Sequence, residues 1–176
     1  MKDVLLGFVD WKELTGYELK RFFSELDYLP WSGNNNQIYT ALLELEKEGL
    51  VEKQTVLQEK LPPQKRYRAT AEGRRRLRKA VLLPAEVASV KNDFLLHLAW
   101  AERLTTEEIV GLIDDYQHQT ELELAMCKEK MKRGEPREGR SGRADYIWGM
   151  IRQNRAMMLR AELNWLRLLR NGLARK

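Results

Sequence analysis

The chain has 176 residues, of which 43% are hydrophobic and 32% charged, with a formal net charge of +5. This balance is typical of a folded protein with one or two small domains and excludes a disordered chain. No signal peptide or membrane-spanning run is recognisable, and the single cysteine, Cys127, excludes an internal disulfide framework, so we expect a cytoplasmic protein without a membrane partner.

The first fifty residues are predicted to form three helices. An apolar element spans residues 4–9, and Thr15-Gly16-Tyr17-Glu18 has the sequence of a capping box at the start of a second helix. Residues 30–33, with a proline and a glycine, predict a turn. A third helix is expected from about Asn34 to Glu48, ended by Gly49 in a left-handed conformation.

The next segment predicts two antiparallel strands and a helix. Residues 51–57 are rich in β-formers, residues 65–70 can return beside them, and Pro62-Pro63 suits the exposed turn between them. Thr70 then caps a helix that ends before Pro84. Three helices, a two-stranded ribbon and a helix are the order of a winged helix-turn-helix, which we assign to residues 1–83 as a DNA-binding domain.

From residue 84 onward only helices are predicted: a short one near residues 94–101, a long one opened by the capping box Thr105–Glu108, and a last one from about Ala144 to Leu169. An apolar stripe this regular on the last helix needs another helical surface to cover it. We therefore expect a mainly α protein in which residues 84–176 are a helical dimerisation region. The expected dimerisation residues are Ile147, Ile151, Met158, Trp165 and Leu168.

Catalysis has little support in the sequence. His97, His118 and Cys127 do not stand at metal-ligand spacing, and no glycine-rich phosphate loop or nucleophile elbow is present. We expect no enzyme, no metal and no cofactor.

Two features of the sequence favour a DNA-binding function. Asn34-Asn35-Asn36-Gln37-Ile38-Tyr39-Thr40 begins the third helix, where a helix-turn-helix meets base edges, although Asn can also simply cap a helix. Residues 53–79 contain 10 basic and 2 acidic side chains, an excess that suits phosphate but can also be an ordinary solvated surface.

Four motifs closely resemble the PadR family of bacterial transcriptional regulators, in the right order over residues 5–80. They are Leu14-Thr15-Gly16-Tyr17-Glu18-Leu19, Gln37-Ile38-Tyr39, Leu45-Glu46-Lys47-Glu48-Gly49-Leu50-Val51 and Tyr67-Arg68-Ala69-Thr70-Ala71-Glu72-Gly73. The resemblance implies a winged-helix homodimer built by C-terminal helices, binding of a roughly palindromic double-stranded operator and often repression. Some members respond to phenolic acids or other aromatic compounds.

Carried over to this chain, the resemblance implies that Tyr17 packs between helices with its hydroxyl toward a phosphate. Relatives commonly have basic residues in the middle of the recognition helix, where this chain has Leu43 and Glu44, and Glu44 would repel phosphate if it faced DNA. The expected DNA-binding residues are Tyr17, Asn34, Asn35, Asn36, Gln37, Tyr39, Thr40, Lys65, Arg66 and Arg68.

A small aromatic effector is a further hypothesis. Trp100, Trp148 and Trp165 fall in the helical region and could border an apolar pocket, with Arg152 and Arg155 near a ligand carboxylate, although tryptophans at helical spacing are usually core. The alternative function is a dimeric protein–protein adaptor that keeps the winged-helix fold but does not bind DNA.

Overall fold

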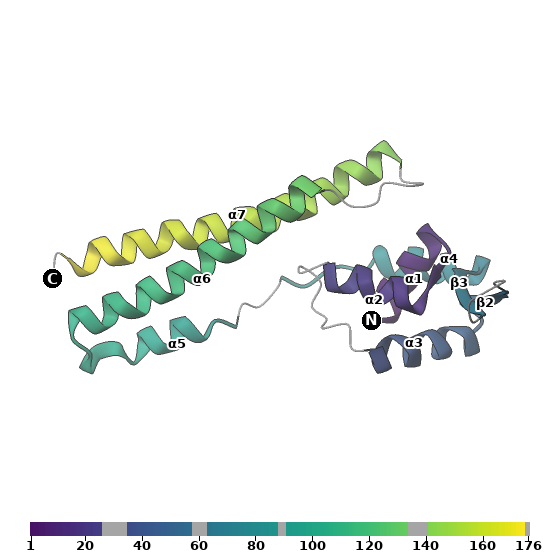
Figure 1. The fold of residues 1–176 in the computed structure, drawn as a ribbon, viewed down its shortest axis with the longest axis horizontal. Coiled ribbons are helices and arrows are strands. Elements are labelled where there is room, and N and C mark those ends of the chain that lie inside the picture. The colour runs from purple at the N-terminus through teal and green to yellow at the C-terminus, as the bar shows by residue number, and fades with distance from the viewer. Residues whose placement is uncertain (26–34, 58–62, 88–90, 134–140, 175–176) are drawn as a thin grey trace. The chain divides into compact units, whose positions relative to one another are not determined.

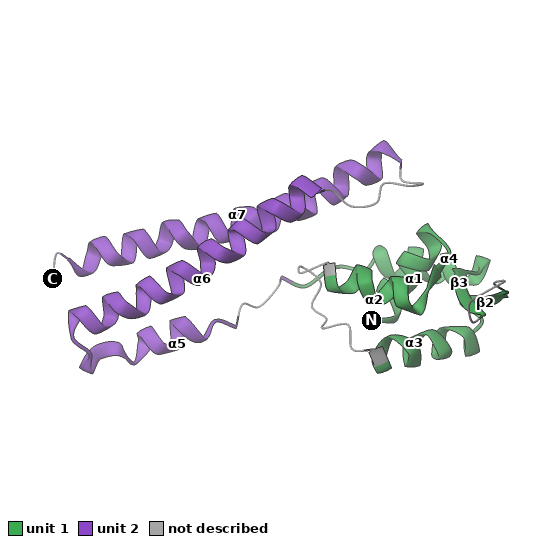
Figure 2. Cartoon of the chain, viewed as in Figure 1, with its two compact units in different colours: residues 1–86 green, residues 87–176 purple. Residues whose placement is uncertain are grey.

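The computed structural model describes residues 1–25, 35–57, 63–87, 91–133 and 141–174. The chain forms two compact units, Met1–Glu86 and Val87–Lys176 (Figure 1, Figure 2). The turn predicted at residues 30–33 lies outside the described residues, as does Asn34.

The first unit has the predicted winged helix-turn-helix order, with one strand more than the sequence indicated. Its elements are α1 (Lys2–Trp11), β1 (Leu14–Thr15), α2 (Gly16–Glu25), α3 (Asn35–Lys47), β2 (Val51–Val56), β3 (Gln64–Ala69) and α4 (Ala71–Val81).

The sheet is antiparallel with the strand order β1-β3-β2. β2 and β3 form the hairpin of the wing, and Thr55 pairs with Lys65 near its described end. The additional strand β1 pairs Leu14 with Tyr67 and Thr15 with Arg66. Two residues are too short to show an alternating pattern, so the sequence predicted only the capping box at this position.

That capping box is present. The amide of Glu18 donates to Thr15 Oγ1 at 3.1 Å, and Glu18 Oε2 accepts from the amide of Thr15 at 2.8 Å. Two amides that the helix itself leaves unpaired are thereby satisfied. Since Thr15 also belongs to β1, the start of α2 is joined directly to the sheet.

The end of α3 is also as predicted. Gly49 has a φ of +70°, its amide bonds the Glu46 carbonyl at 3.0 Å, and the amide of Leu50 reaches back to the Leu45 carbonyl at 2.9 Å. This is a Schellman motif, which glycine forms without the steric penalty of a Cβ atom. The turn sends the chain from the helix directly into β2.

The start of α4 packs tightly against this turn. Thr70 is its N-cap: its hydroxyl oxygen accepts from the amide of Gly73 at 3.0 Å, and its own amide bonds the Leu50 carbonyl at 3.0 Å. A Cβ atom at Gly73 would overlap the carbonyl oxygen of Leu50. Glycine is therefore required here for a close approach of two backbone segments.

The core of the first unit lies among α1, α2, α3 and β3. Phe8 stacks on Phe22 with ring centroids 5.7 Å apart, and Leu42 is fully buried. Each such aliphatic side chain contributes about 1.5–3 kcal/mol when it leaves water. The other most deeply buried side chains of this unit are Leu5, Leu6, Val9, Leu14, Leu19, Ile38 and Leu45.

The second unit is helical: α5 (Asp93–Ala99), a short 3-10 turn (Ala101–Arg103), α6 (Thr106–Arg133) and α7 (Gly142–Leu173). The predicted capping box opens α6, with the amide of Glu108 donating to Thr105 Oγ1 at 3.2 Å. α6 and α7 pack along each other (Figure 1). Two apolar clusters join the helices. One is centred on Phe94, Ile113 and Leu166, and the other on Leu124, Ala156 and Leu159.

Much of the predicted stripe on α7 is not covered within the protomer. Met158 is 48% exposed and Leu168 is 71% exposed. Ile147 and Ile151 are exposed too, whereas Trp165 is partly buried against the Phe94 cluster. Among the described helices, none is both long enough and apolar enough to cross a membrane.

Candidate nucleic-acid interface and a pocket in the second unit

Helix α3 has one buried and one exposed side. Ile38, Leu42 and Leu45 face the core, as their spacing predicted. Gln37 and Thr40 lie on the exposed side, as does Asn36. Their amide and hydroxyl groups are the types that read base edges in a major groove. The side chain of Asn35, like Asn34, lies outside the described part.

A groove of about 660 Å³ lies between α3, the start of α2 and the wing. We call it the wing groove. It brings together four of the residues predicted at a DNA contact, Tyr17, Tyr39, Lys65 and Arg66, and also Leu43. The approach of α2 to α3 depends on Gly16, where a Cβ atom would lie 2.5 Å from Tyr39 Cε1.

Tyr17 does not have the expected packing role. Its side chain is 71% exposed, so it lines the wing groove instead of filling a space between helices. The adjacent Gly16 is the residue that permits close packing, because its missing Cβ leaves room for the Tyr39 ring. The exposed Tyr17 hydroxyl is still placed where it can donate to an anion in the groove.

A smaller groove of about 400 Å³ lies on the other side of the exposed face of α3. We call it the Lys2 groove. Gln37, Thr40 and Glu44 line it together with Lys2 at the start of α1. The Lys2 ammonium lies 2.8 Å from Glu44 Oε2 and 2.7 Å from Glu48 Oε1.

Ion pairs divide the basic residues of the wing into two groups. Arg68 is paired with Glu52 at 2.5 Å and with Glu13 at 3.7 Å, and these carboxylates raise the pKa of its guanidinium. Lys65 and Arg66, in contrast, form no ion pair with any residue that the structure describes. Two of the three predicted wing contacts therefore keep their charge for an external anion.

Ion pairs also neutralise part of the basic surface of α4. Arg74 lies 2.9 Å from Asp10, Arg75 pairs with Glu72, and Arg76 lies 3.4 Å from Asp3. These pairs are exposed and each is worth little energy. They show, however, that much of the positive excess of residues 53–79 is balanced by neighbouring carboxylates.

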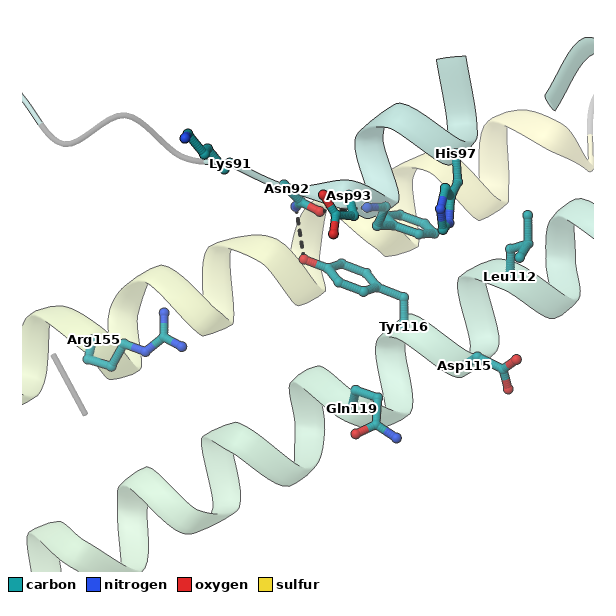
Figure 3. Close-up of a pocket in the computed structure, with 10 residues that line it drawn as sticks. Lys91, Asn92, Asp93, His97, Leu112, Asp115, Tyr116, Gln119 and Arg155 are labelled. Atoms are coloured by element: carbon teal, nitrogen blue, oxygen red, sulfur yellow. Dashed lines mark hydrogen bonds between the residues drawn. The ribbon is translucent and has the colours of Figure 1, made fainter. Parts of the chain in front are cut away.

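The second unit contains a pocket of about 590 Å³ beside the start of α5 (Figure 3). Its wall includes the rings of Phe94 and Tyr116, which stack with centroids 4.1 Å apart. Asn92, the N-cap of α5, donates to the Tyr116 hydroxyl oxygen at 2.9 Å, and that hydroxyl donates to Glu162 at 3.1 Å. The remaining residues of the wall are Lys91, Asp93, His97, Leu112, Asp115, Gln119 and Arg155.

This pocket combines an apolar wall with charges at its edge. Burial raises the pKa of the Tyr116 hydroxyl, which is therefore protonated at neutral pH. In the view of Figure 3 the hydroxyl points to the side where Lys91 and Arg155 lie, and Asp115 lies on the other side. Such a site suits a flat ligand with an anionic end.

The three tryptophans proposed for a pocket do not form one within a protomer. Trp148 and Trp165 both lie on α7, and seventeen residues of helix separate them by about 25 Å. Trp165 packs edge-on against Phe94 at 6.2 Å, and Trp100 is 79% exposed. Of the residues expected near a ligand, Arg155 is the one that lines the observed pocket.

The sequence missed Phe94, Tyr116 and Asn92 as pocket residues because they come from two separate segments. Phe94 and Tyr116 fit helical periodicity in the sequence, whereas the capping role of Asn92 is evident only in the structure. Within the described ranges there is no group of three or more His, Cys, Asp or Glu residues that could hold a metal ion.

Comparison with protein families gives two matches that follow the two units. The model of the "Transcriptional regulator PadR-like family" matches residues 5–79. That of "Virulence activator alpha C-term" matches residues 90–174. The negative transcriptional regulator PadR of Bacillus subtilis is 27% identical over 126 residues, which are 71% of this chain and 69% of that protein.

Solved structures show the same fold over nearly the whole chain. Bacillus subtilis PadR in complex with operator DNA aligns with a TM-score of 0.86 at 22% identity, covering 98% of both chains. The same protein in complex with p-coumaric acid aligns with a TM-score of 0.80 at 22% identity, over 98% of this chain and 94% of that one. A PadR-like regulator of Bacillus cereus aligns with a TM-score of 0.75 at 26% identity, with the same coverage.

Proposed function

We propose that this chain is a PadR-like DNA-binding transcriptional regulator that binds a roughly palindromic operator as a homodimeric repressor, because its first unit matches the PadR-like family model and has two grooves beside α3. A single recognition helix reads only a few base pairs, and a two-fold dimer doubles the site. Residues 1–83 bind the DNA and residues 84–176 form the dimer. The protein acts in the cytoplasm and performs no catalysis.

One observation carries the DNA-binding proposal: polar side chains on α3 and uncompensated cations on the wing flank the same exposed surface. Gln37 and Thr40 are on α3, while Lys65 and Arg66 are in the wing groove without an ion-pair partner among the described residues. The helix can enter a major groove while the wing reaches the adjacent backbone or minor groove. Asn34, Asn35, Asn36, Tyr39 and Tyr17 are proposed as further contacts.

Base-reading and phosphate-binding residues are expected to behave differently on substitution. Gln37→Ala and Thr40→Ala should each reduce the discrimination between bases at particular operator positions by about 1–3 kcal/mol, because each removes a base contact. Lys65→Ala and Arg66→Ala should weaken binding to all sequences and lower the salt slope by about one unit for each lost phosphate contact. Fluorescence anisotropy on duplexes at several salt concentrations measures both effects.

Arg68→Ala is the matched control for the wing. Arg68 has the same side chain as Arg66 on the same strand but is held by Glu52 and Glu13. Its removal should leave the salt slope nearly unchanged. A slope insensitive to Lys65 and Arg66 would contradict the wing contact, and the failure of the wild-type protein to enrich any site from random duplexes would favour the protein–protein adaptor.

We further propose that the pocket beside α5 binds a small aromatic carboxylate that regulates DNA binding. The stacked rings of Phe94 and Tyr116 offer an apolar wall, and Arg155 can pair with a carboxylate. Lys91 and Asn92 line the pocket and lie near the start of the second unit, which begins at Val87. A ligand bound here is expected to change the operator affinity of the full-length protein.

Titration with p-coumaric acid is expected to quench tryptophan emission saturably, because Trp165 packs on the pocket residue Phe94. Arg155→Ala should weaken the apparent affinity about tenfold or more, since it removes a charge-assisted pair. A matched ligand without the carboxylate, such as p-vinylphenol, should bind the wild-type protein and the variant alike. Linear quenching for both compounds, with operator binding unmoved, would contradict an effector role for the pocket.

A further inference from the structure

A carboxylate lies beside the two polar residues that we expect to meet base edges. Glu44 follows Gln37 by seven residues and Thr40 by four, so the turns of the helix bring all three side chains to one side of α3. They line the Lys2 groove together. The Glu44 side chain is 50% exposed and so remains accessible from that groove.

Lys2 is the reason why this carboxylate can lie close to a polyanion. Its ammonium is 2.8 Å from Glu44 and 2.7 Å from Glu48, and the two hydrogen bonds raise the pKa of Lys2. The pair offsets the charge of Glu44 and connects the start of α1 to the recognition helix. The carboxylate is therefore both held in place and partly neutralised.

A carboxylate can only accept hydrogen bonds, and this makes it selective in a major groove. Phosphates offer it no donor. Among base edges, cytosine offers the N4 amine, whereas guanine and thymine offer acceptors that repel it; adenine offers a donor beside an acceptor. We propose that Glu44 accepts a hydrogen bond from the N4 amine of a cytosine and thereby selects cytosine at one position of each half-site. This inference rests on the proposed operator binding.

Selection from random duplexes with the full-length protein tests the inference, using the wild type, Glu44→Gln and the control Glu48→Gln. Both variants remove one negative charge from a partner of Lys2, but Glu48 follows the end of α3 and does not line the groove. We expect both to bind DNA in general more tightly. Only Glu44→Gln should also lose the cytosine preference, because glutamine can both donate and accept.

The strength of the preference is measured next, as affinities for the selected operator with each of the four bases at that position. The wild type and Glu48→Gln should favour cytosine over guanine or thymine by about 5- to 150-fold, the range for one good base contact. Glu44→Gln should reduce that ratio to a few-fold. A base profile of Glu44→Gln identical to that of the wild type overturns the inference while leaving operator binding intact. A wild-type protein that selects no sequence overturns the proposed function itself.

Discussion

A glutamate in place of Met158 is expected to separate the proposed homodimer and to lower operator affinity by about 10²- to 10⁴-fold, the gain that linking two half-sites provides. Met158 lies on the exposed part of the α7 stripe, between Ile151 and Leu168. A two-fold interface brings two copies of the new charge into an apolar contact, where an unpaired charge is costly. Sedimentation velocity measures the assembly, and anisotropy measures DNA affinity.

Gln153→Glu is the matched control. It introduces the same charge five residues away, at an exposed position about 140° around the helix. It should leave both the dimer and DNA binding unchanged. A Met158→Glu protein that remains dimeric with wild-type affinity would show that this stripe is not the interface.

Deleting α7 would be a poorer test, because the helix also supplies the protomer's own core. Ala156, Leu159 and Leu166 belong to the two clusters that join it to the rest of the second unit. A truncation after Arg143 would therefore unfold this unit and confuse folding with assembly. The helicity of Met158→Glu, measured by circular dichroism, should instead stay at the wild-type level.

Gly73→Ala is expected to destabilise the first unit by about 3 kcal/mol or more, at the upper end of the cost of overpacking. The added methyl group would overlap the Leu50 carbonyl oxygen, which belongs to the backbone and cannot rotate away. For a unit of this size the melting temperature should fall by about 10–20 °C. Thermal unfolding monitored by circular dichroism, together with DNA binding at increasing temperature, provides the measurement.

Gly7→Ala is the control within the same unit. Gly7 is in the interior of α1, and a Cβ atom there would meet only Leu77 Cδ1 at 3.9 Å. Alanine is the better helix former, so this change should be neutral or stabilising by up to about 1 kcal/mol. Equal stability of the two variants would contradict the close approach of α4 to the turn after α3.

Local rules explain why so much of the fold could be predicted from the sequence. Thr15, Gly49 and Thr70 each end or begin a helix through contacts within a few residues, and their types reveal that role. The strand β1 could not be predicted in this way, because its two residues become a strand only by pairing with Tyr67 and Arg66, some fifty residues later.

The candidate sites also combine features set by local sequence with features set by contacts between distant segments. The polar side of α3 follows from helical spacing, whereas the difference between Arg66 and Arg68 depends on carboxylates from other elements. The pocket likewise needs α5 and α6 to meet before Phe94 and Tyr116 can stack. The predicted tryptophan pocket does not form within a protomer, because the number of tryptophans in the region says nothing about how far apart Trp148 and Trp165 lie along α7.

Thr15 has a consequence for the DNA that this protein can bind. The same residue caps α2 and pairs with Arg66 on the wing strand, and α2 in turn packs against the recognition helix α3. Through α2, the recognition helix and the wing are therefore held together. In the proposed complex the offset between their two contacts along the duplex is set by the protein. One base pair inserted between those contacts would shift one of them by about 3.4 Å and rotate it by about 35°, beyond what a side chain can follow without loss. A one-base-pair insertion within a half-site of a natural operator should therefore weaken binding.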